Sequence, residues 1–157
     1  MIEITQAESP EQIEEIRKLF REYENWLDID LCFQDFEKEL ANLPGKYEKP
    51  DGRLFLISEK NQSAGCIALR KIDVDVCEMK RLFVRGDFRG LGLGKMLIEK
   101  LLEEARSTGY KRMRLDTLPD KMPLAVKLYK SYGFCEIAPY YHNPHEETLF
   151  MELDLNE

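Results

Sequence analysis

Apolar side chains recur along the chain with two different periods, and the changes of period predict where helices and strands alternate. Residues Ile2–Gln6 alternate apolar and polar positions, which is typical of a strand with one buried face. Ser9, Pro10 and Gln12 then have the spacing of a capped helix start, with proline at the first helical position. Apolar residues at spacings of three and four continue that helix to about Leu27.

The next segments favour strands that pair in an antiparallel manner. A weaker helical pattern covers Phe33–Leu43 and ends at a Pro-Gly turn. Short apolar runs at Leu54–Ser58 and Ala64–Arg70 flank a polar turn, so they predict a hairpin. Val76–Val84 predicts a further strand.

The second half of the chain alternates helices with strands. An apolar stripe from Leu93 to Ala105 predicts a helix that ends at Gly109. The remaining predicted elements are a strand at Arg112–Thr117, a helix through Ala125–Tyr132 ending at Gly133, and strands at Phe134–Tyr141 and Thr148–Leu155. Early hairpins combined with one strand–helix–strand crossover predict a mixed sheet in an α/β fold, as one domain over residues 1–157.

Composition and charge narrow the functional classes. The chain has 23 Lys and Arg against 30 Asp and Glu, a net charge of −7. A nucleic-acid-binding protein usually carries a basic excess, so we expect no nucleic-acid partner. The apolar runs are too short to cross a bilayer, and the first ten residues lack the features of a signal peptide. We therefore expect a cytoplasmic protein without a membrane partner.

The four cysteines, Cys32, Cys66, Cys77 and Cys135, have no C-x-x-C spacing, and the chain has only 2 histidines. This pattern predicts no metal site. In a cytosolic setting we expect the thiols to be reduced and mostly buried.

The most informative segment, Arg89-Gly-Leu-Gly-Leu-Gly-Lys95, lies between a predicted strand and a predicted helix. Gly90, Gly92 and Gly94 remove Cβ atoms where backbone amides would approach a ligand closely. The following helix offers unpaired N–H groups and a positive dipole end, and Arg89 and Lys95 add positive charge. Together these features predict a site for a diphosphate group.

Three alternatives compete with this interpretation. The first is a glycine-rich turn without a ligand. The second, a nucleoside-triphosphate loop, requires Ser or Thr where this chain has Met96, which cannot bind magnesium. The third, a dinucleotide-binding Rossmann unit, would explain Asp116 at the end of the next strand. A Rossmann unit has the glycine spacing G-x-G-x-x-G, however, whereas this chain has G-x-G-x-G. In addition, five residues separate the strand from the first glycine here.

The segment Arg89–Gly94 resembles the R/Q-x-x-G-x-G/A signature of the GNAT superfamily of N-acetyltransferases. Glu78–Val84 (EMKRLFV) is similar to the fourth strand of that family, and Leu115–Thr117 is similar to its fifth. Leu128–Phe134 (LYKSYGF) resembles its L-Y-x-x-x-G-F helix end. The resemblance covers Glu78–Phe134 and implies the GNAT fold, with about seven strands, four helices, and splayed fourth and fifth strands.

The resemblance also implies that acetyl-CoA is the acetyl donor and that no metal is required. Pantetheine would lie between the splayed strands, in backbone contact with Leu82, Phe83 and Val84. The pyrophosphate would lie on the turn residues Arg89, Gly90, Leu91, Gly92, Leu93, Gly94 and Lys95. Many family members contact pantetheine with an asparagine that this chain lacks, and Thr117, Lys121 and Lys127 are the candidates to replace it.

The implied reaction is direct attack of a primary amine on the thioester in a ternary complex. Glu78 resembles the family's general base, although it could also be a solvent-exposed or ion-paired strand residue while water relays the proton. Tyr129 matches the general acid that protonates the thiolate, and a core tyrosine is the alternative. Strand alternation places Glu78 on one face with Lys80, Leu82 and Val84 unless a bulge intervenes.

The resemblance implies an acceptor pocket built by Tyr23–Phe36 and Pro139–Glu147. Its candidate substrate residues are Tyr140, Tyr141, His142 and Asn143, although the tyrosines could instead pack on the sheet edge. Trp26 is interpreted as a core residue. Because both segments are bulky, they favour a small-molecule amine over a protein tail. A homodimer is left open, and the alternative function is a non-catalytic acyl-CoA-binding module.

Overall fold

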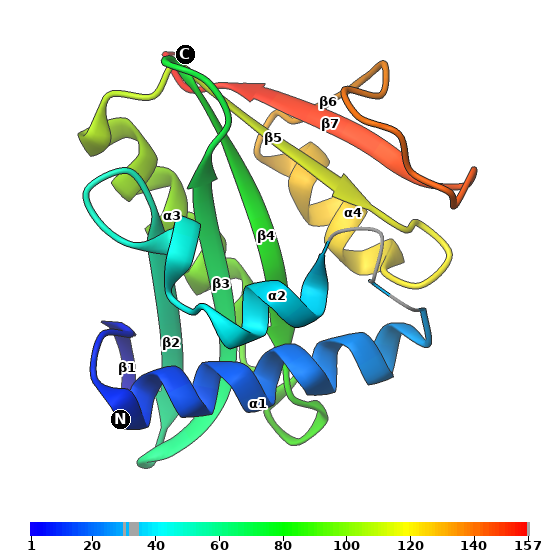
Figure 1. Ribbon diagram of the computed structural model, residues 1–157. Coiled ribbons are helices and arrows are strands. Elements are labelled where there is room, and N and C mark those ends of the chain that lie inside the picture. Colours follow the sequence, from blue (N-terminus) through cyan, green and yellow to red (C-terminus); the bar gives the residue numbers. More distant parts are fainter. Residues whose placement is uncertain (30, 32–34, 157) are drawn as a thin grey trace.

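The computed structural model describes residues 1–29, 31 and 35–156, and these contain one seven-stranded mixed sheet with helices on both faces (Figure 1). The strands are β1 (Ile2–Gln6), β2 (Arg53–Glu59), β3 (Gln62–Lys71), β4 (Val76–Val84), β5 (Arg112–Thr117), β6 (Cys135–Ile137) and β7 (Leu149–Asp154). Their order across the sheet is β1-β2-β3-β4-β5-β7-β6. Only β4 and β5 are parallel among the paired strands of the described chain, so the predicted mixed α/β fold is confirmed.

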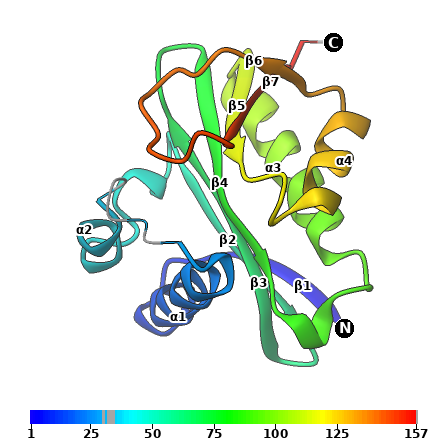
Figure 2. The same cartoon turned by 90° about the vertical axis from the view of Figure 1, so that its right-hand side faces the viewer.

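The helices form a layer on each side of the sheet (Figure 2). They are α1 (Pro10–Leu27), α2 (Phe36–Ala41), α3 (Leu93–Thr108) and α4 (Pro123–Ser131), with 3₁₀ turns η2 (Gly45–Tyr47) and η3 (Gly86–Phe88). Helices α1 and α2 cover one face, and α3 and α4 cover the other. Because both faces are covered, β2 is apolar on both: Leu54 packs toward α1 and Phe55 toward α3.

The ends of the two long helices follow from their sequences. The side chain of Ser9 accepts a hydrogen bond from the Gln12 amide at 3.2 Å, and the Gln12 side chain accepts one from the Ser9 amide at 3.1 Å. This is the predicted capping box. Helix α3 ends at Gly109, whose φ of 101° is left-handed and therefore suits glycine.

Two predicted elements are shorter than expected. Helix α2 covers Phe36–Ala41 of the predicted Phe33–Leu43, and Phe33 lies outside the described residues. Strand β6 ends at Ile137, so the prediction that it extends to Tyr141 is wrong. Pro139 has no N–H with which to continue the ladder, and the residues that follow it form a loop before β7.

Strand β4 contains a bulge that changes which side chains share a face. Cys66 pairs with Phe83 and Ala68 pairs with Lys80, so β4 has one extra residue at this point. Arg81 lies there with a left-handed φ of 60°. Beyond the bulge Leu82 returns to the face that holds Met79, while Phe83 faces α1. The bulge that the sequence left open is therefore present, and it removes Leu82 and Val84 from the face that holds Glu78.

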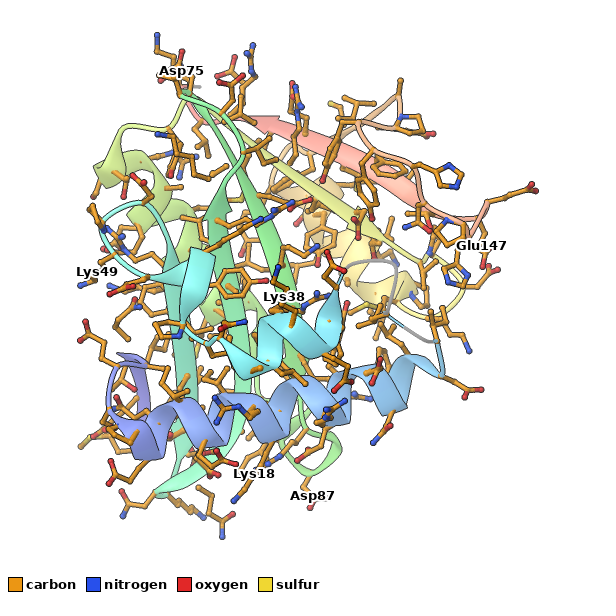
Figure 3. All side chains as sticks on the ribbon, in the orientation of Figure 1. Lys18, Lys38, Lys49, Asp75, Asp87 and Glu147 are labelled. Atoms are coloured by element: carbon orange, nitrogen blue, oxygen red, sulfur yellow. The ribbon has the colours of Figure 1, made fainter. Side chains whose placement is uncertain are left out.

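Two of the three described thiols are buried and many charged side chains are exposed, as the polarity of these groups predicts. Cys66 and Cys77 are buried free thiols, Cys135 is an exposed one, and Cys32 lies outside the described residues. Charged side chains such as Lys18 on α1 and Glu147 before β7 project from the surface (Figure 3). None of the described helices combines the length and apolar character needed to cross a bilayer.

Candidate active site

Strands β4 and β5 begin side by side and then separate (Figure 1). They pair only where Val76–Glu78 lies beside Arg112–Arg114. Beyond that point, Met79–Val84 and Leu115–Thr117 form no ladder with each other. The strands therefore leave a gap in the sheet, and two cavities reach this gap.

The larger cavity, which we call the glycine-turn cleft, has a volume of about 440 Å³ and lies between the end of β4 and the N-termini of α3 and α4. This volume lies within the range usual for small-molecule sites. The predicted cofactor residues that line it are Leu82, Phe83, Val84, Arg89, Gly90, Gly92, Leu93, Gly94 and Lys95. Leu91 is exposed and does not line it, and Thr117 lines the other cavity instead.

The backbone of the turn leaves open space where a phosphate would bind. Gly90 and Gly92 have φ values of 87° and 76°, and a Cβ on either would meet nothing within 4 Å. Gly92 is the N-cap of α3, and no side chain among the described residues caps this end of the helix. The first amides of α3, from Leu93 to Lys95, can therefore bind an anion, so the site fits a pyrophosphate.

Trp26 forms part of this cleft. Its side chain is 39% exposed and lines the cleft, so its interpretation as a core residue is wrong. The Arg89 guanidinium carbon lies 4.7 Å from the Trp26 ring centroid, and Arg89 Nε donates to the Val84 carbonyl at 3.0 Å. Trp26 comes directly before Leu27, the last buried residue of the apolar stripe of α1, and is not itself part of that stripe. This position outside the stripe was the signal in the sequence that Trp26 is not a core residue.

The second cavity, which we call the tyrosine cavity, has a volume of about 50 Å³ within the gap between β4 and β5. Tyr23 of α1, Tyr129 of α4 and Asp116 of β5 contribute to its wall, as do residues of β4 and of the loop before β7. Leu82 and Met122 line both cavities, so the two spaces lie next to each other there.

Tyr129 offers a protonated phenol to the tyrosine cavity. Its side chain is 4% exposed and its ring lies 5.7 Å from that of Phe134. No described residue forms a hydrogen bond with its hydroxyl. Burial, with smaller contributions from Tyr23 and Asp116, raises the pKa of Tyr129 well above its ordinary value, so the hydroxyl keeps its proton at neutral pH.

Glu78 is buried in an ionic network and lines neither cavity. Its side chain is 1% exposed, and it accepts hydrogen bonds from Arg70 Nε at 2.6 Å and from the Tyr140 hydroxyl at 2.5 Å. Lys80 Nζ lies 3.9 Å away. Burial alone would raise the pKa of Glu78, but Lys80, Arg70 and the Tyr140 hydroxyl together hold it below its ordinary value. This geometry favours the ion-paired interpretation of Glu78 over the base.

The loop before β7 is attached to both splayed strands. Tyr140 donates to Glu78 of β4, and Tyr141 donates to Asp116 of β5. Asn143 Nδ2 donates to the Tyr141 hydroxyl at 3.0 Å. Of the predicted substrate residues only Asn143 lines the tyrosine cavity, whereas Tyr140 and Tyr141 anchor the loop and His142 is exposed.

The sequence did not indicate Lys80 or Asp116 as residues of the tyrosine cavity, whereas Tyr23 and His145 belong to the two segments that were expected to build the acceptor pocket. The sequence suggested a role for Asp116 only as the acid of a Rossmann unit, although its place at the end of the fifth strand was a usable signal. Burial and the neighbouring Arg81 lower the pKa of Lys80. Among the described residues, no group of three or more His, Cys, Asp or Glu side chains could hold a metal ion.

Comparisons with known proteins agree with this geometry. A model of the acetyltransferase (GNAT) family matches residues 13–134. The chain is 38% identical to an uncharacterized N-acetyltransferase of Schizosaccharomyces pombe, over 99% of this chain and 96% of that protein. An acetyltransferase structure from Streptococcus agalactiae has a TM-score of 0.80 at 26% identity, covering 98% of each chain. A putative acetyltransferase from Salmonella typhimurium, solved with its cofactor acetyl-CoA, has a TM-score of 0.67 at 20% identity, covering 99% of this chain and 95% of that one.

Proposed function

This chain belongs to the acetyltransferase (GNAT) family and uses acetyl-CoA as its acetyl donor, and from that premise we propose that it acetylates a primary amine of a small molecule by direct attack in a ternary complex. The observation that carries the proposal is that Leu82 and Met122 line both cavities, which makes the two spaces neighbours. A donor in one cavity and an acceptor in the other would meet beside these two residues.

The two reactants would occupy different cavities. The glycine-turn cleft is built mainly from the ends of α3 and α4 with Trp26 of α1, whereas the tyrosine cavity receives Tyr23 from α1 and Tyr129 from α4. Neither reactant therefore has to leave before the other binds. This arrangement supports direct transfer rather than transfer through a modified enzyme side chain.

The residues of the glycine-turn cleft would orient the donor. When bound, acetyl-CoA supplies a thioester carbonyl and a thiolate leaving group. The amides of Leu93–Lys95 would bind the pyrophosphate, and the backbone of Leu82–Val84 would pair with pantetheine. Because Arg89 now donates to the Val84 carbonyl, its side chain would turn away when that carbonyl pairs with the donor.

The residues of the tyrosine cavity would select the acceptor and supply the proton that the thiolate needs. Tyr129 holds its proton at neutral pH and lies in the wall of the cavity, so it would act as the general acid. The small volume of about 50 Å³ supports a small amine rather than a protein tail. Glu78 would position Tyr140 and Arg70 through its hydrogen bonds.

A thiol-release assay with acetyl-CoA and a panel of amines tests the proposal. We expect release to rise with at least one amine and to fall by roughly 10²–10⁴-fold in Tyr129→Phe, the usual contribution of a general acid. Tyr132→Phe is the matched control, because it removes a hydroxyl that bonds to Glu99 on the surface. Tight CoA binding without amine-dependent release would instead identify a non-catalytic acyl-CoA-binding module.

A further inference from the structure

We propose that Asp116 binds the ammonium group of the acceptor and takes its proton before the attack, a step that rests on the proposed function. Asp116 lies near the end of β5 and lines the tyrosine cavity. Its neighbours in sequence, Leu115 and Thr117, are buried, whereas Asp116 is only half-buried. Asp116 therefore places a carboxylate in the wall of the tyrosine cavity.

Asp116 is the only carboxylate among the described residues that line the tyrosine cavity. Tyr141 donates to Asp116 Oδ2, and Asn143 donates in turn to the Tyr141 hydroxyl. Both donors come from the loop before β7, so they fix the orientation of the carboxylate. A carboxylate offers about four lone-pair positions, which leaves acceptor positions for an ammonium group.

The charged and titratable groups around Asp116 come from every element packed against it. Tyr23 lies on α1, Lys80 and Arg81 on β4, Tyr129 on α4, and His145 in the loop before β7. Tyr140, Tyr141 and Glu78 complete the surroundings. Burial raises the pKa of Tyr23 to about 12, and the charge of Asp116 contributes to that shift. The tyrosines therefore stay neutral, and of these groups Asp116 is the carboxylate in the cavity wall, so it is the one that can pair with the positive charge of an ammonium group.

Glu78 differs from Asp116 in both access and pairing. Glu78 lines neither cavity and is held by Arg70 and Tyr140, with Lys80 nearby. These partners stabilise its charged form, which makes it a weak proton acceptor. The two carboxylates lie on the two splayed strands, and each receives a tyrosine of the same loop. Only Asp116 also faces the cavity.

The proton balance of the transfer assigns one role to each side chain. The acceptor enters as an ammonium, and Asp116 takes one of its protons and passes it to solvent. The amine nitrogen then forms a bond to the carbonyl carbon, and the carbon–sulfur bond breaks with its electron pair on sulfur. Tyr129 gives its proton to the thiolate, and the second proton lost by the nitrogen restores the Tyr129 hydroxyl.

The test measures kcat/KM between pH 6 and pH 10 in Asp116→Asn, with Asp120→Asn as the matched control because Asp120 is exposed in the next loop. At pH 7 we expect Asp116→Asn to lose roughly 10²–10⁴-fold. The deficit should shrink toward pH ~10, where an alkylamine loses its proton unaided. The deficit of Tyr129→Phe should not shrink in this way. CoA affinity should stay at the wild-type value in Asp116→Asn.

Each outcome decides the inference. A wild-type rate and pH profile in Asp116→Asn overturns the assignment while acetyl transfer by the wild type stands. A wild type that acetylates no amine overturns the proposed function itself. If Asp116→Asn fails to fold, Tyr141→Phe provides a second variant, because it removes the hydroxyl that orients the carboxylate. We expect about tenfold lower kcat/KM there with CoA binding intact, as for loss of one hydrogen bond to a charged group, and an unchanged value overturns the assignment.

Discussion

The glycine-turn cleft and the tyrosine cavity lie next to each other at Leu82 and Met122 but are built in opposite ways. The cleft depends on the backbone of one short segment, residues 89–95, and on the helix that follows it. The cavity depends on side chains from α1, β4, β5, α4 and the loop before β7. The cleft is therefore encoded locally in the sequence, whereas the cavity exists only after the chain has folded.

The two regions also differ in charge. Arg89, Lys95 and Lys121 line the cleft, and no acidic side chain of the described chain joins them there. The cavity has Lys80, Arg81 and Asp116 in its wall. Arg81 is 4% exposed and its guanidinium bonds to Glu39 at 2.9 and 3.0 Å. Ionic networks thus maintain the cavity, while the cleft presents positive charge to an anion.

The largest effect that we expect is on stability, from Glu78→Gln in the ionic network beside the cavity. This change leaves Arg70 and Lys80 without the carboxylate they share, so it should lower the free energy of unfolding by about 3 kcal/mol. This value is the low end for breaking a buried ion pair, and we choose it because Arg70 is part-exposed. Urea denaturation at pH 7 measures this loss. Glu136→Gln on the exposed edge strand β6 is the control.

The loss of stability in Glu78→Gln should depend on pH. Because the pKa of Glu78 is lower in the folded state, its stabilisation is fully present above the unfolded-state value of about 4.3. It is lost as the pH falls through the folded-state pKa. The stability difference between wild type and Glu78→Gln should therefore narrow in acid. A difference that widens below pH ~4 would contradict the ionised pair.

The sequence predicted the turn and strand residues that line the cleft because their signals are local, and cofactor binding by these residues stays a prediction. Glycine spacing, the helix start after the turn and the end of β4 all lie within a few residues of one another. The tyrosine cavity was predicted only in outline, because no local pattern shows that Tyr141 bonds to Asp116 or that Tyr140 bonds to Glu78. Those contacts join residues 25 and 62 positions apart.

The bulge in β4 decides the side-chain directions that strand alternation left open. Alternation alone places Glu78 and Leu82 on one face, but the left-handed Arg81 reverses the alternation between them. Arginine is an unusual residue for a positive φ, so the sequence contained no glycine or asparagine to indicate the bulge. The buried ion pair with Glu39 helps to hold Arg81 in place.

A smaller effect, on cofactor affinity, is expected from Gly94→Ala. A Cβ at this position would have its nearest neighbour, Val84 Cγ2, at 4.0 Å, so the fold accepts it. If the turn binds phosphates through its amides, the added methyl group should weaken CoA binding about tenfold, which is about 1.4 kcal/mol. Titration calorimetry measures the affinity. Gly86→Ala, in open space outside the cleft, is the control, and equal affinities in the two variants would contradict close approach at Gly94.

The smallest effect is expected at the aromatic wall of the cleft. Trp26→Leu removes the contact with the Arg89 guanidinium, which is worth about 0.5–1 kcal/mol at an exposed site. If that contact holds Arg89 beside the bound CoA, the Kd for CoA should rise roughly two- to fivefold. The chain has 1 tryptophan, so the fluorescence of the wild type reports on the surroundings of Trp26, which include Arg89 and Phe83. We expect CoA to change that emission as Arg89 leaves the Val84 carbonyl. Val74→Ala, at an exposed position outside both cavities, should leave emission and affinity unchanged. If saturating CoA leaves the emission spectrum unchanged, Arg89 and Trp26 keep their arrangement when the cleft fills. In that case the side chains of the cleft, like its backbone, are already arranged for binding before CoA enters.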